Sequence, residues 1–409
     1  MTALGLYIHI PWCPTRCIYC DFNTYIEANQ SLKERYHVAL LKEIRETGIA
    51  TGHPPLNTIF LGGGTPTTLN PNQMLEIIDT VAKSFTLHAS AEITTESNPA
   101  TLSLDYLRAI RRGGINRLSM GVQSFRQEEL SLLSRLHDVP TVHHAVEWAR
   151  QAEFDNLSLD LIFNLPYQTL SQWEYNLQQA INLNPDHLSI YSLILEAGTP
   201  MQRQVTQGQL PQPDDDVSAD MYEASMTMLA EAGFEQYEIS NWAKRDIGSA
   251  GFQPASVRRT EVSTPKLASA HNLIYWRNQS YLGLGAGAFG TYNQVRRANL
   301  KRPHDYIKRI ETGTGLGMAQ DEKTVEAIDR PTAMMEHIML GLRLTKEGVS
   351  ATEFETRFEV KLVDHYQTAI DYGRSNGLLE WIEAGDDQRL RLTPSGYLLA
   401  NQVIVQFIE

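Results

Sequence analysis

Short apolar runs alternate with helical patterns along the first 240 residues. The runs have the length and the bounding turn residues of buried strands, and they are Leu6–Ile10, Asn57–Leu61, Ala91–Glu96, Arg117–Gly121, Leu157–Phe163 and His187–Leu193. Between the first two, apolar residues at 32, 36, 40 and 44 recur every fourth position and predict a helix with one apolar face. Ser103 precedes a similar pattern and is a predicted N-cap. These repeated units predict a parallel sheet with crossover helices.

Polar or glycine-rich residues follow nearly every predicted strand at its C-terminal end. They are a cysteine loop after the first strand, Gly62–Thr67 after the second, Glu96 and Asn98 at the third, Gln123 at the fourth, Asp160 in the fifth and Glu196 after the sixth. The carboxyl ends of barrel strands meet at one mouth, where barrel active sites lie. Any one of these residues could equally cap a helix, but six in register favour a shared site. We therefore expect an α/β chain with a closed or partial TIM-like barrel rather than a Rossmann sheet.

The remainder of the chain divides by composition. Residues 1–243 carry the barrel pattern, and residues 244–268 are rich in Gly, Ser, Thr, Pro and Arg, which predicts a flexible, exposed insertion. Residues 269–330 are assigned to a segment that accompanies the barrel. Residues 331–409 predict a small helical, winged-helix-like domain with a β-hairpin near its end. In an acidic chain we interpret that shape as a protein-packing module rather than a DNA reader.

Charge and hydropathy limit the kinds of partner and the cellular location that we expect. The 409 residues carry a formal net charge of −13, which argues against general nucleic-acid binding. The sequence has no run of 18 apolar residues, and it does not start with a cationic segment followed by a long apolar one. We therefore expect a cytoplasmic protein without stable membrane insertion.

The chain has only three cysteines, and they lie within eight residues as Cys13-x3-Cys17-x2-Cys20. An odd, clustered set is a poor disulfide framework and indicates a metal or redox site. Cubane iron–sulfur clusters usually take four thiolates, so three leave one iron open for a substrate or cofactor. S-adenosylmethionine can chelate that iron through its amino and carboxylate groups. A zinc site is the alternative, but it needs a fourth ligand, and His9 lies inside the predicted strand.

Other residues at the predicted mouth suit this cofactor. Gly63 and Gly64 permit close backbone approach to a ligand. Glu96 and Asp160 can accept hydrogen bonds from ribose hydroxyls or an amino group, although a capping or surface role for each alone is as good an explanation. Gln123 can add a polar contact. The guanidinium group of Arg135 is suited to binding a carboxylate.

The stretch Tyr7-Ile-His-Ile-Pro-Trp-Cys13 through Cys20-Asp21-Phe22 resembles the radical S-adenosylmethionine superfamily, in particular its coproporphyrinogen-oxidase-like branch. The likeness covers nearly the whole chain, with further motifs at 62–67, 119–125, 160–162, 185–191, 238–241, 271–276 and 283–288. It implies a partial (β/α)6 barrel and a [4Fe–4S] cluster on Cys13, Cys17 and Cys20. It also implies S-adenosylmethionine contacts at Tyr7, Tyr19, Gly63, Gly64, Thr65, Glu96, Gln123, Arg135 and Asp160.

Two kinds of protein share this branch. Oxygen-independent coproporphyrinogen III oxidases decarboxylate two propionates of a porphyrinogen to give protoporphyrinogen IX, whereas heme chaperones bind heme and deliver it to hemoproteins. The oxidases resemble Cys-x3-Cys-x2-Cys-x-Cys, and the fourth position here is Phe22. The oxidases also carry a long extension ahead of the barrel, and six residues precede Tyr7 here. We therefore expect a heme chaperone, with the radical decarboxylase as the disfavoured alternative.

The motif His-Asn-x-x-Tyr-Trp at 271–276 resembles the heme-associated motif of the chaperones. An imidazole can ligate heme iron, and aromatic rings offer a flat apolar surface. The spacing alone favours a plainer interpretation, in which a His–Asn pair caps a turn and two aromatic rings join the core. The resemblance implies instead heme contacts at His271, Asn272, Tyr275 and Trp276, without fixing the axial ligand. The predicted insertion directly precedes this motif.

The resemblance also defines the expected partners. They are heme-accepting proteins, with respiratory hemoproteins among them, and an electron donor if radical chemistry occurs. A respiratory recipient would favour transient contact with a membrane. A homodimer is compatible with the sequence, but nothing in it requires one.

Overall fold

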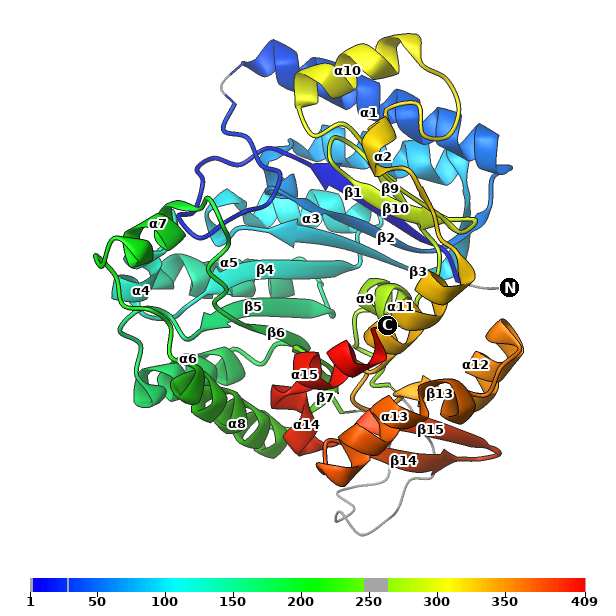
Figure 1. Cartoon of the computed structure of the whole chain (residues 1–409). Helices are drawn as coiled ribbons and strands as arrows, with labels where there is room; N and C mark the ends of the chain where they lie inside the picture. Colours follow the sequence, from blue (N-terminus) through cyan, green and yellow to red (C-terminus); the bar gives the residue numbers. More distant parts are fainter. Residues whose placement is uncertain (1–2, 28, 246–263, 409) are drawn as a thin grey trace. The chain divides into compact units, whose positions relative to one another are not determined.

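The computed structural model describes residues 3–27, 29–245 and 264–408 (Figure 1). Most of the predicted insertion, residues 246–263, lies outside the described residues. The chain forms two compact units. The first comprises Met1–Asp186, Ile190–Met221 and Gln279–Ala327, and the second comprises His187–Ser189, Tyr222–Asn278 and Ile328–Glu409.

The first unit is built on a sheet with a parallel centre. Its strands are β1 (Gly5–Ile10), β2 (Pro55–Gly63), β3 (Thr86–Ser97), β4 (Arg117–Gln123), β5 (Leu157–Phe163), β9 (Tyr281–Leu284), β10 (Phe289–Tyr292), β11 (Val295–Ala298) and β12 (Glu326–Ala327). They lie in the order β12-β11-β10-β9-β1-β2-β3-β4-β5. Strands β1 to β5 are parallel to one another and to β9, whereas β9 to β12 are joined antiparallel. The predicted parallel sheet is confirmed, and the antiparallel extension was not predicted.

Crossover helices connect the parallel strands. The helices of this unit are α1 (Gln30–Thr51), α2 (Pro71–Ser84), α3 (Leu104–Arg112), α4 (Gln127–Leu132), α5 (Val139–Gln151), α6 (Leu170–Asn182), α7 (Pro200–Thr206) and α10 (Pro303–Thr312), with short 3-10 turns at Pro66–Thr68, Pro99–Thr101 and Glu322–Thr324. Helix α1 packs against α2 and α10, as Figure 1 shows at the top of the view. The Ser103 hydroxyl accepts the N–H of Tyr106, so the predicted N-cap of α3 is confirmed.

Two elements cross from one unit to the other. Strand β6 (His187–Ser192) begins in the second unit, where its first three residues pair antiparallel with β8 (Asn241–Lys244). Helix α8 (Asp215–Glu231) begins in the first unit. All six predicted strands are therefore present, and β3 starts at Thr86 rather than at Ala91.

The second unit contains a small sheet and most of the C-terminal helices. Its further elements are β7 (Phe234–Glu238), α9 (Ala270–Trp276), α11 (Arg330–Gly341), β13 (Val349–Ser350), α12 (Ala351–Phe358), α13 (Leu362–Ser375), β14 (Leu379–Ala384), β15 (Asp387–Leu392), α14 (Pro394–Leu398) and α15 (Ala400–Ile404), with a 3-10 turn at Val405–Phe407. Strands β14 and β15 form the predicted hairpin, and β13 pairs with β15. A core that includes Phe354, Ile370, Leu390 and Phe407 lies beneath them.

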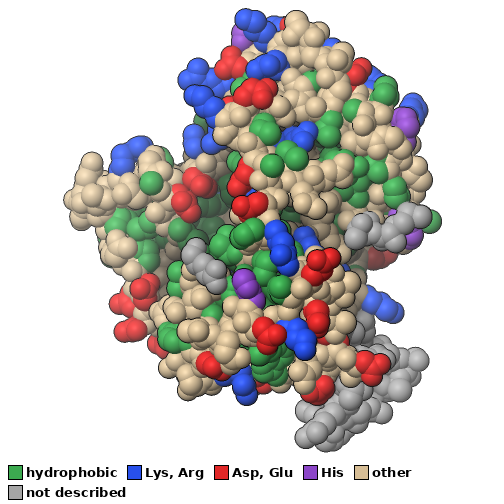
Figure 2. All heavy atoms as spheres, turned by 45° about the vertical axis from the view of Figure 1, so that its right-hand side comes forward, with side chains coloured by type: hydrophobic (Ala, Val, Ile, Leu, Met, Phe, Trp, Pro, Cys, Tyr) green, Lys and Arg blue, Asp and Glu red, His purple; other side chains and the backbone are tan. Residues whose placement is uncertain are grey.

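The surface is mixed in charge. On the face shown in Figure 2, Lys and Arg side chains are interspersed with Asp and Glu. None of the described helices combines the length and apolarity that a bilayer crossing requires.

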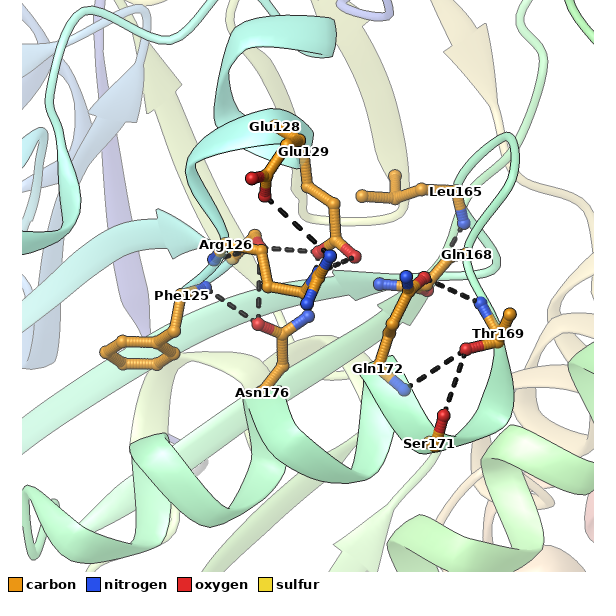
Figure 3. A network of polar contacts seen from close by, with 11 residues as sticks. Phe125, Arg126, Glu128, Glu129, Leu165, Gln168, Thr169, Ser171, Gln172 and Asn176 are labelled. Atoms are coloured by element: carbon orange, nitrogen blue, oxygen red, sulfur yellow. Dashed lines mark hydrogen bonds and ion pairs between the residues drawn. The ribbon is translucent and has the colours of Figure 1, made fainter.

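A buried polar network fixes the turn between β4 and α4 (Figure 3). Asn176 of α6 accepts the N–H of Phe125 at 2.8 Å and donates to Glu129 at 2.8 Å. The Ser124 hydroxyl donates to Glu129 at 2.5 Å, and Arg126 lies 3.3 Å from the other carboxylate oxygen. The network ties the residues that follow β4 to α6.

Replacing Asn176 by Leu tests this network. The change leaves the Glu129 carboxylate and the Phe125 N–H short of partners in the interior, so we expect the free energy of unfolding to fall by about 2 kcal/mol or more. Urea unfolding followed by circular dichroism measures the loss. Gln178→Leu, at an exposed position of the same helix, is the matched control. Equal stabilities of the two variants would contradict the role assigned to Asn176.

Candidate functional site

The loop after β1 carries the three cysteines. All three are free and partly buried. The Cys13 N–H donates to the Tyr25 carbonyl at 3.0 Å, and the Cys20 N–H donates to the Cys17 carbonyl at 3.2 Å. A thiolate at Cys17 would raise the pKa of both Cys13 and Cys20, so the three sulfurs lie close enough to interact electrostatically. The loop therefore gathers the predicted cluster ligands.

The glycine loop after β2 holds the cysteine loop in place. The Gly64 N–H donates to Ile10 and the Thr65 N–H to Trp12, both at 2.8 Å to the carbonyl oxygen. A Cβ on Gly64 would lie 2.7 Å from the Trp12 carbonyl oxygen, so only glycine permits this approach. The Thr65 hydroxyl lies 3.5 Å from the Cys13 sulfur. The close approach to Trp12 therefore requires glycine at position 64, in addition to any requirement from the ligand contact that the sequence suggests.

The donor set suits a cluster better than a single metal ion. Burial raises the pKa of the Cys13 and Cys20 thiols, so a bound cationic group is needed to hold them as thiolates. Both ring nitrogens of His9 are engaged, one with the Tyr7 hydroxyl and one with the Asn23 carbonyl, each at 2.9 Å. His9 is therefore no spare fourth ligand for zinc.

Two carboxylates lie on β3 and β5, which are separated in the sheet by β4. Glu96 on β3 accepts the Gly63 N–H at 3.0 Å. Asp160 on β5 accepts the Ser119 hydroxyl at 3.0 Å and that of Ser158 at 3.3 Å. Burial, and then the negative charge of Asp160, raise the pKa of Glu96 to about 7. This edge of the sheet therefore carries excess negative charge that a positively charged ligand would relieve.

Arg135 joins the cysteine loop to the end of β4. Its guanidinium donates to the Gly121 carbonyl at 2.6 Å and to the Cys17 sulfur at 3.4 Å. Tyr19 also contributes to the raised pKa of Arg135, which burial opposes. A Cβ on Gly121 would meet both Gln123 and Arg135, so those two side chains lie close to this glycine. The Nε of Arg135 is buried without a hydrogen-bond partner among the described residues, which leaves one donor for a ligand.

Tyr7 lies deeper on β1. Its ring stacks on Phe60 with centroids 6.2 Å apart, and its hydroxyl faces His9. Burial, and then the charge of Glu96, raise the pKa of Tyr7. All twelve predicted cluster and S-adenosylmethionine residues thus belong to the first unit, on β1 to β5 or in the segments that connect these strands.

The predicted heme residues belong to the second unit, on α9 and directly at its end. Ser269 caps this helix by accepting the Asn272 N–H, so the cap is neither His271 nor Asn272. His271 is fully buried, and its Nε2 lies 2.8 Å from the Tyr275 hydroxyl. Trp276 packs against a cluster that includes Leu273. His271 is therefore in the interior of the unit, whereas Asn272, Tyr275 and Trp276 are only partly buried.

Sequence reasoning missed several residues that support the site. His137 places one ring nitrogen 3.2 Å from the Asn98 side chain and the other 3.0 Å from the Val122 carbonyl. Burial, and then the charge of Arg135, lower the pKa of His137 to about 4, so it is neutral at pH 7. Ser119, the first residue of the motif at 119–125, holds Asp160 through its hydroxyl. The spacing of His137 two residues after Arg135 was the signal available in the sequence.

Comparisons with known proteins agree with this geometry. The sequence pattern of the radical SAM superfamily matches residues 7–180, and that of the HemN C-terminal domain matches residues 328–399. The chain is 36% identical to the heme chaperone HemW of Bacillus subtilis over 98% of each protein. It is also 36% identical to the heme chaperone HemW of Escherichia coli, over 87% of this chain and 86% of that protein.

A solved structure shares the fold. The coproporphyrinogen III oxidase HemN of Escherichia coli, a radical SAM enzyme, superposes with a TM-score of 0.82 at 25% identity, covering 99% of this chain and 90% of that one. The predicted α/β radical SAM architecture is therefore confirmed, as is the family that the motifs indicated.

Replacing Cys17 by Ser tests the cluster site. Two thiolates hold a cubane poorly, so we expect the variant to lose most of its iron and acid-labile sulfide after anaerobic reconstitution. Elemental and sulfide analysis against protein concentration measures this loss. Thr15→Ser, in the same loop, should keep the wild-type content. A full iron and sulfide content in the Cys17 variant would contradict the assignment.

The pKa of Glu96 predicts a pH-dependent gain from Glu96→Gln in the ligand-free chain. The pKa of Glu96 in the folded chain, about 7, lies above the ordinary glutamate value of 4.5, so ionising Glu96 destabilises the folded state as pH rises through this window. The glutamine cannot ionise, and its amide oxygen can still accept the Gly63 N–H. Relative to wild type, the variant should gain on the order of 3 kcal/mol between pH 4 and pH 8.

Urea unfolding at a series of pH values measures this gain. Glu128→Gln, at an exposed carboxylate of the same unit, is the control. A stability difference between Glu96→Gln and wild type that stays constant with pH would show that Glu96 is not buried as described.

Proposed function

Because the chain belongs to the HemW family of radical S-adenosylmethionine proteins, we propose that it is a heme chaperone, which binds heme and delivers it to hemoproteins. The observation that carries the proposal is the likeness to HemW proteins along nearly the whole chain. In this proposal, Cys13, Cys17 and Cys20 hold a [4Fe–4S] cluster whose fourth iron binds S-adenosylmethionine. Heme contacts are assigned to His271, Asn272, Tyr275 and Trp276.

The residues around the cluster have distinct roles in this proposal. Arg135 offers its unpaired Nε–H to the carboxylate of S-adenosylmethionine while its other nitrogens stay on Gly121 and Cys17. Glu96 accepts from the amino group, and Asp160 accepts from the ribose. The backbone at Gly63, Gly64 and Thr65, with Tyr7, Tyr19 and Gln123, completes the enclosure. A bound cluster would supply an electron to S-adenosylmethionine if radical chemistry occurs.

The radical decarboxylase is the competing function, because its fold is shared. Phe22 argues against it. The oxidases place a fourth cysteine at this position, and here a phenyl ring stands there with 65% of its surface exposed. A phenyl ring neither ligates iron nor transfers a proton. We therefore place coproporphyrinogen decarboxylation second.

An anaerobic heme titration of the cluster-reconstituted protein tests the proposal. We expect a Soret band that saturates at about one heme per chain, because the proposal assigns one heme motif. The loaded protein should then pass heme to an apo-hemoprotein added in excess. Absence of saturable binding would count against a chaperone.

The decarboxylase is tested on the same preparation. Coproporphyrinogen III, S-adenosylmethionine and a reductant are supplied, and chromatography follows vinyl-bearing product. We expect none above the level of the Cys17→Ser variant. Stoichiometric product in the absence of heme binding would reverse the order of the two functions.

A further inference from the structure

Helix α9 is anchored at both ends by residues of its own unit. Before the helix, the Ser269 N–H donates to the Tyr237 hydroxyl at 3.1 Å. Immediately after it, Arg277 forms a two-pronged ion pair with Glu347 at 2.5 and 2.9 Å. The Trp276 side chain therefore projects from a fixed point.

One face of the Trp276 ring carries an arginine. The guanidinium carbon of Arg343 lies 4.7 Å from the centre of the indole. Arg343 is tied to the segment after β7, because its Nη2 donates to the Ile239 carbonyl at 2.5 Å and its backbone carbonyl accepts the Ile239 N–H at 3.1 Å. Its Nε, however, is buried and has no hydrogen-bond partner among the described residues. A guanidinium stacked on a ring keeps its in-plane donors available for an anion.

The edge of the same ring faces buried polar groups. Glu238 is completely buried and accepts a hydrogen bond from the Asn241 side chain. Burial raises the pKa of Glu238 to about 7, while Asn241, Arg343 and the Trp276 indole N–H oppose that shift. Within the part of the chain that the structure describes, Oδ1 of Asn241 is buried without a hydrogen-bond partner, and the Trp276 indole N–H reaches the Glu238 carboxylate only weakly. Poorly satisfied buried polar atoms are rare in folded proteins, and here they belong to side chains that interact with Glu238, which is itself within reach of the Trp276 indole.

We propose that Arg343 binds a propionate of heme when the macrocycle lies against Trp276, and so makes the site select porphyrins with free carboxylates. Heme combines a flat apolar ring with two carboxylates at one edge. An indole face suits the ring, and a guanidinium suits a carboxylate because its forked donors match the two oxygens. On binding, the guanidinium moves from the face of Trp276 to the edge of the porphyrin, and its unpaired Nε–H gains an acceptor. Glu238 and Asn241 keep the indole in its orientation.

This inference rests on the proposed heme binding. Titration with two ligands distinguishes a failure of the inference from a failure of heme binding itself. Wild type and variants are titrated with heme and with heme dimethyl ester, whose carboxylates are capped, in the same mild detergent. Wild type should prefer heme. Arg343→Met should weaken heme binding about tenfold and leave the ester affinity unchanged, so the preference disappears. Arg343→Lys should restore part of it. Trp276→Leu should weaken both ligands to a similar extent.

Arg374→Met is the matched control, because that arginine lies exposed in the same unit, in the last turn of α13. It should retain the preference for heme. If Arg343→Met retains the wild-type preference, or weakens both ligands equally, Arg343 has no role in propionate binding. If wild type binds both ligands equally well, the inference fails while heme binding stands. If wild type binds neither ligand, the proposed function itself fails.

Discussion

The parallel register of β1 to β5 is the constraint on which the rest of the first unit depends. Because these strands run in one direction, their carboxyl ends open on one edge, and the loops that follow them must share that space. Glu96, Asp160 and three cysteines are brought together near that edge, and Arg135 is the cation that contacts Cys17 there. Many groups that ionise to anions are crowded together here with little access to water, which disfavours their charged forms. Burial, and then the neighbouring negative charges, accordingly raise the pKa values of Glu96, Cys13 and Cys20. Iron and a sulfonium ligand are positively charged groups that such a place stabilises.

Much of the motif sequence serves to hold the ligand-binding residues rather than to bind. Gly64 and Thr65 fix the cysteine loop through backbone hydrogen bonds to Ile10 and Trp12. Ser124 and Phe125 belong to the same motif as Gln123, yet their partners are Asn176 and Glu129 in the interior. A motif therefore records two requirements at once, the chemistry of a site and the rigidity of the loop that presents it.

The sequence predicted the parallel strands, the helix at α1, the N-cap at Ser103 and the cysteine loop because each depends on local pattern. Short-range periodicity reports burial, and a cap needs only a few neighbouring residues. It did not predict the extension β9 to β12, whose strands are four residues or fewer and carry little periodicity. It also could not predict Asn176 as a partner of Phe125, since 51 residues separate them and either could pair elsewhere. The burial of His271 was equally out of reach, because it is set by packing around α9.

The burial of His271 bears on what the proposed delivery of heme would need. If heme iron takes His271, the contact between its Nε2 and Tyr275 must first break, and Trp276 must exchange the guanidinium on its face for the porphyrin. The free energy of that opening is subtracted from the intrinsic affinity, because only the open fraction of the protein binds. A storage protein would gain nothing from this arrangement. A protein that must release its heme to a recipient benefits from a lower net affinity. The cost of opening lowers the affinity, while the iron ligand and the carboxylate contact can still make binding selective.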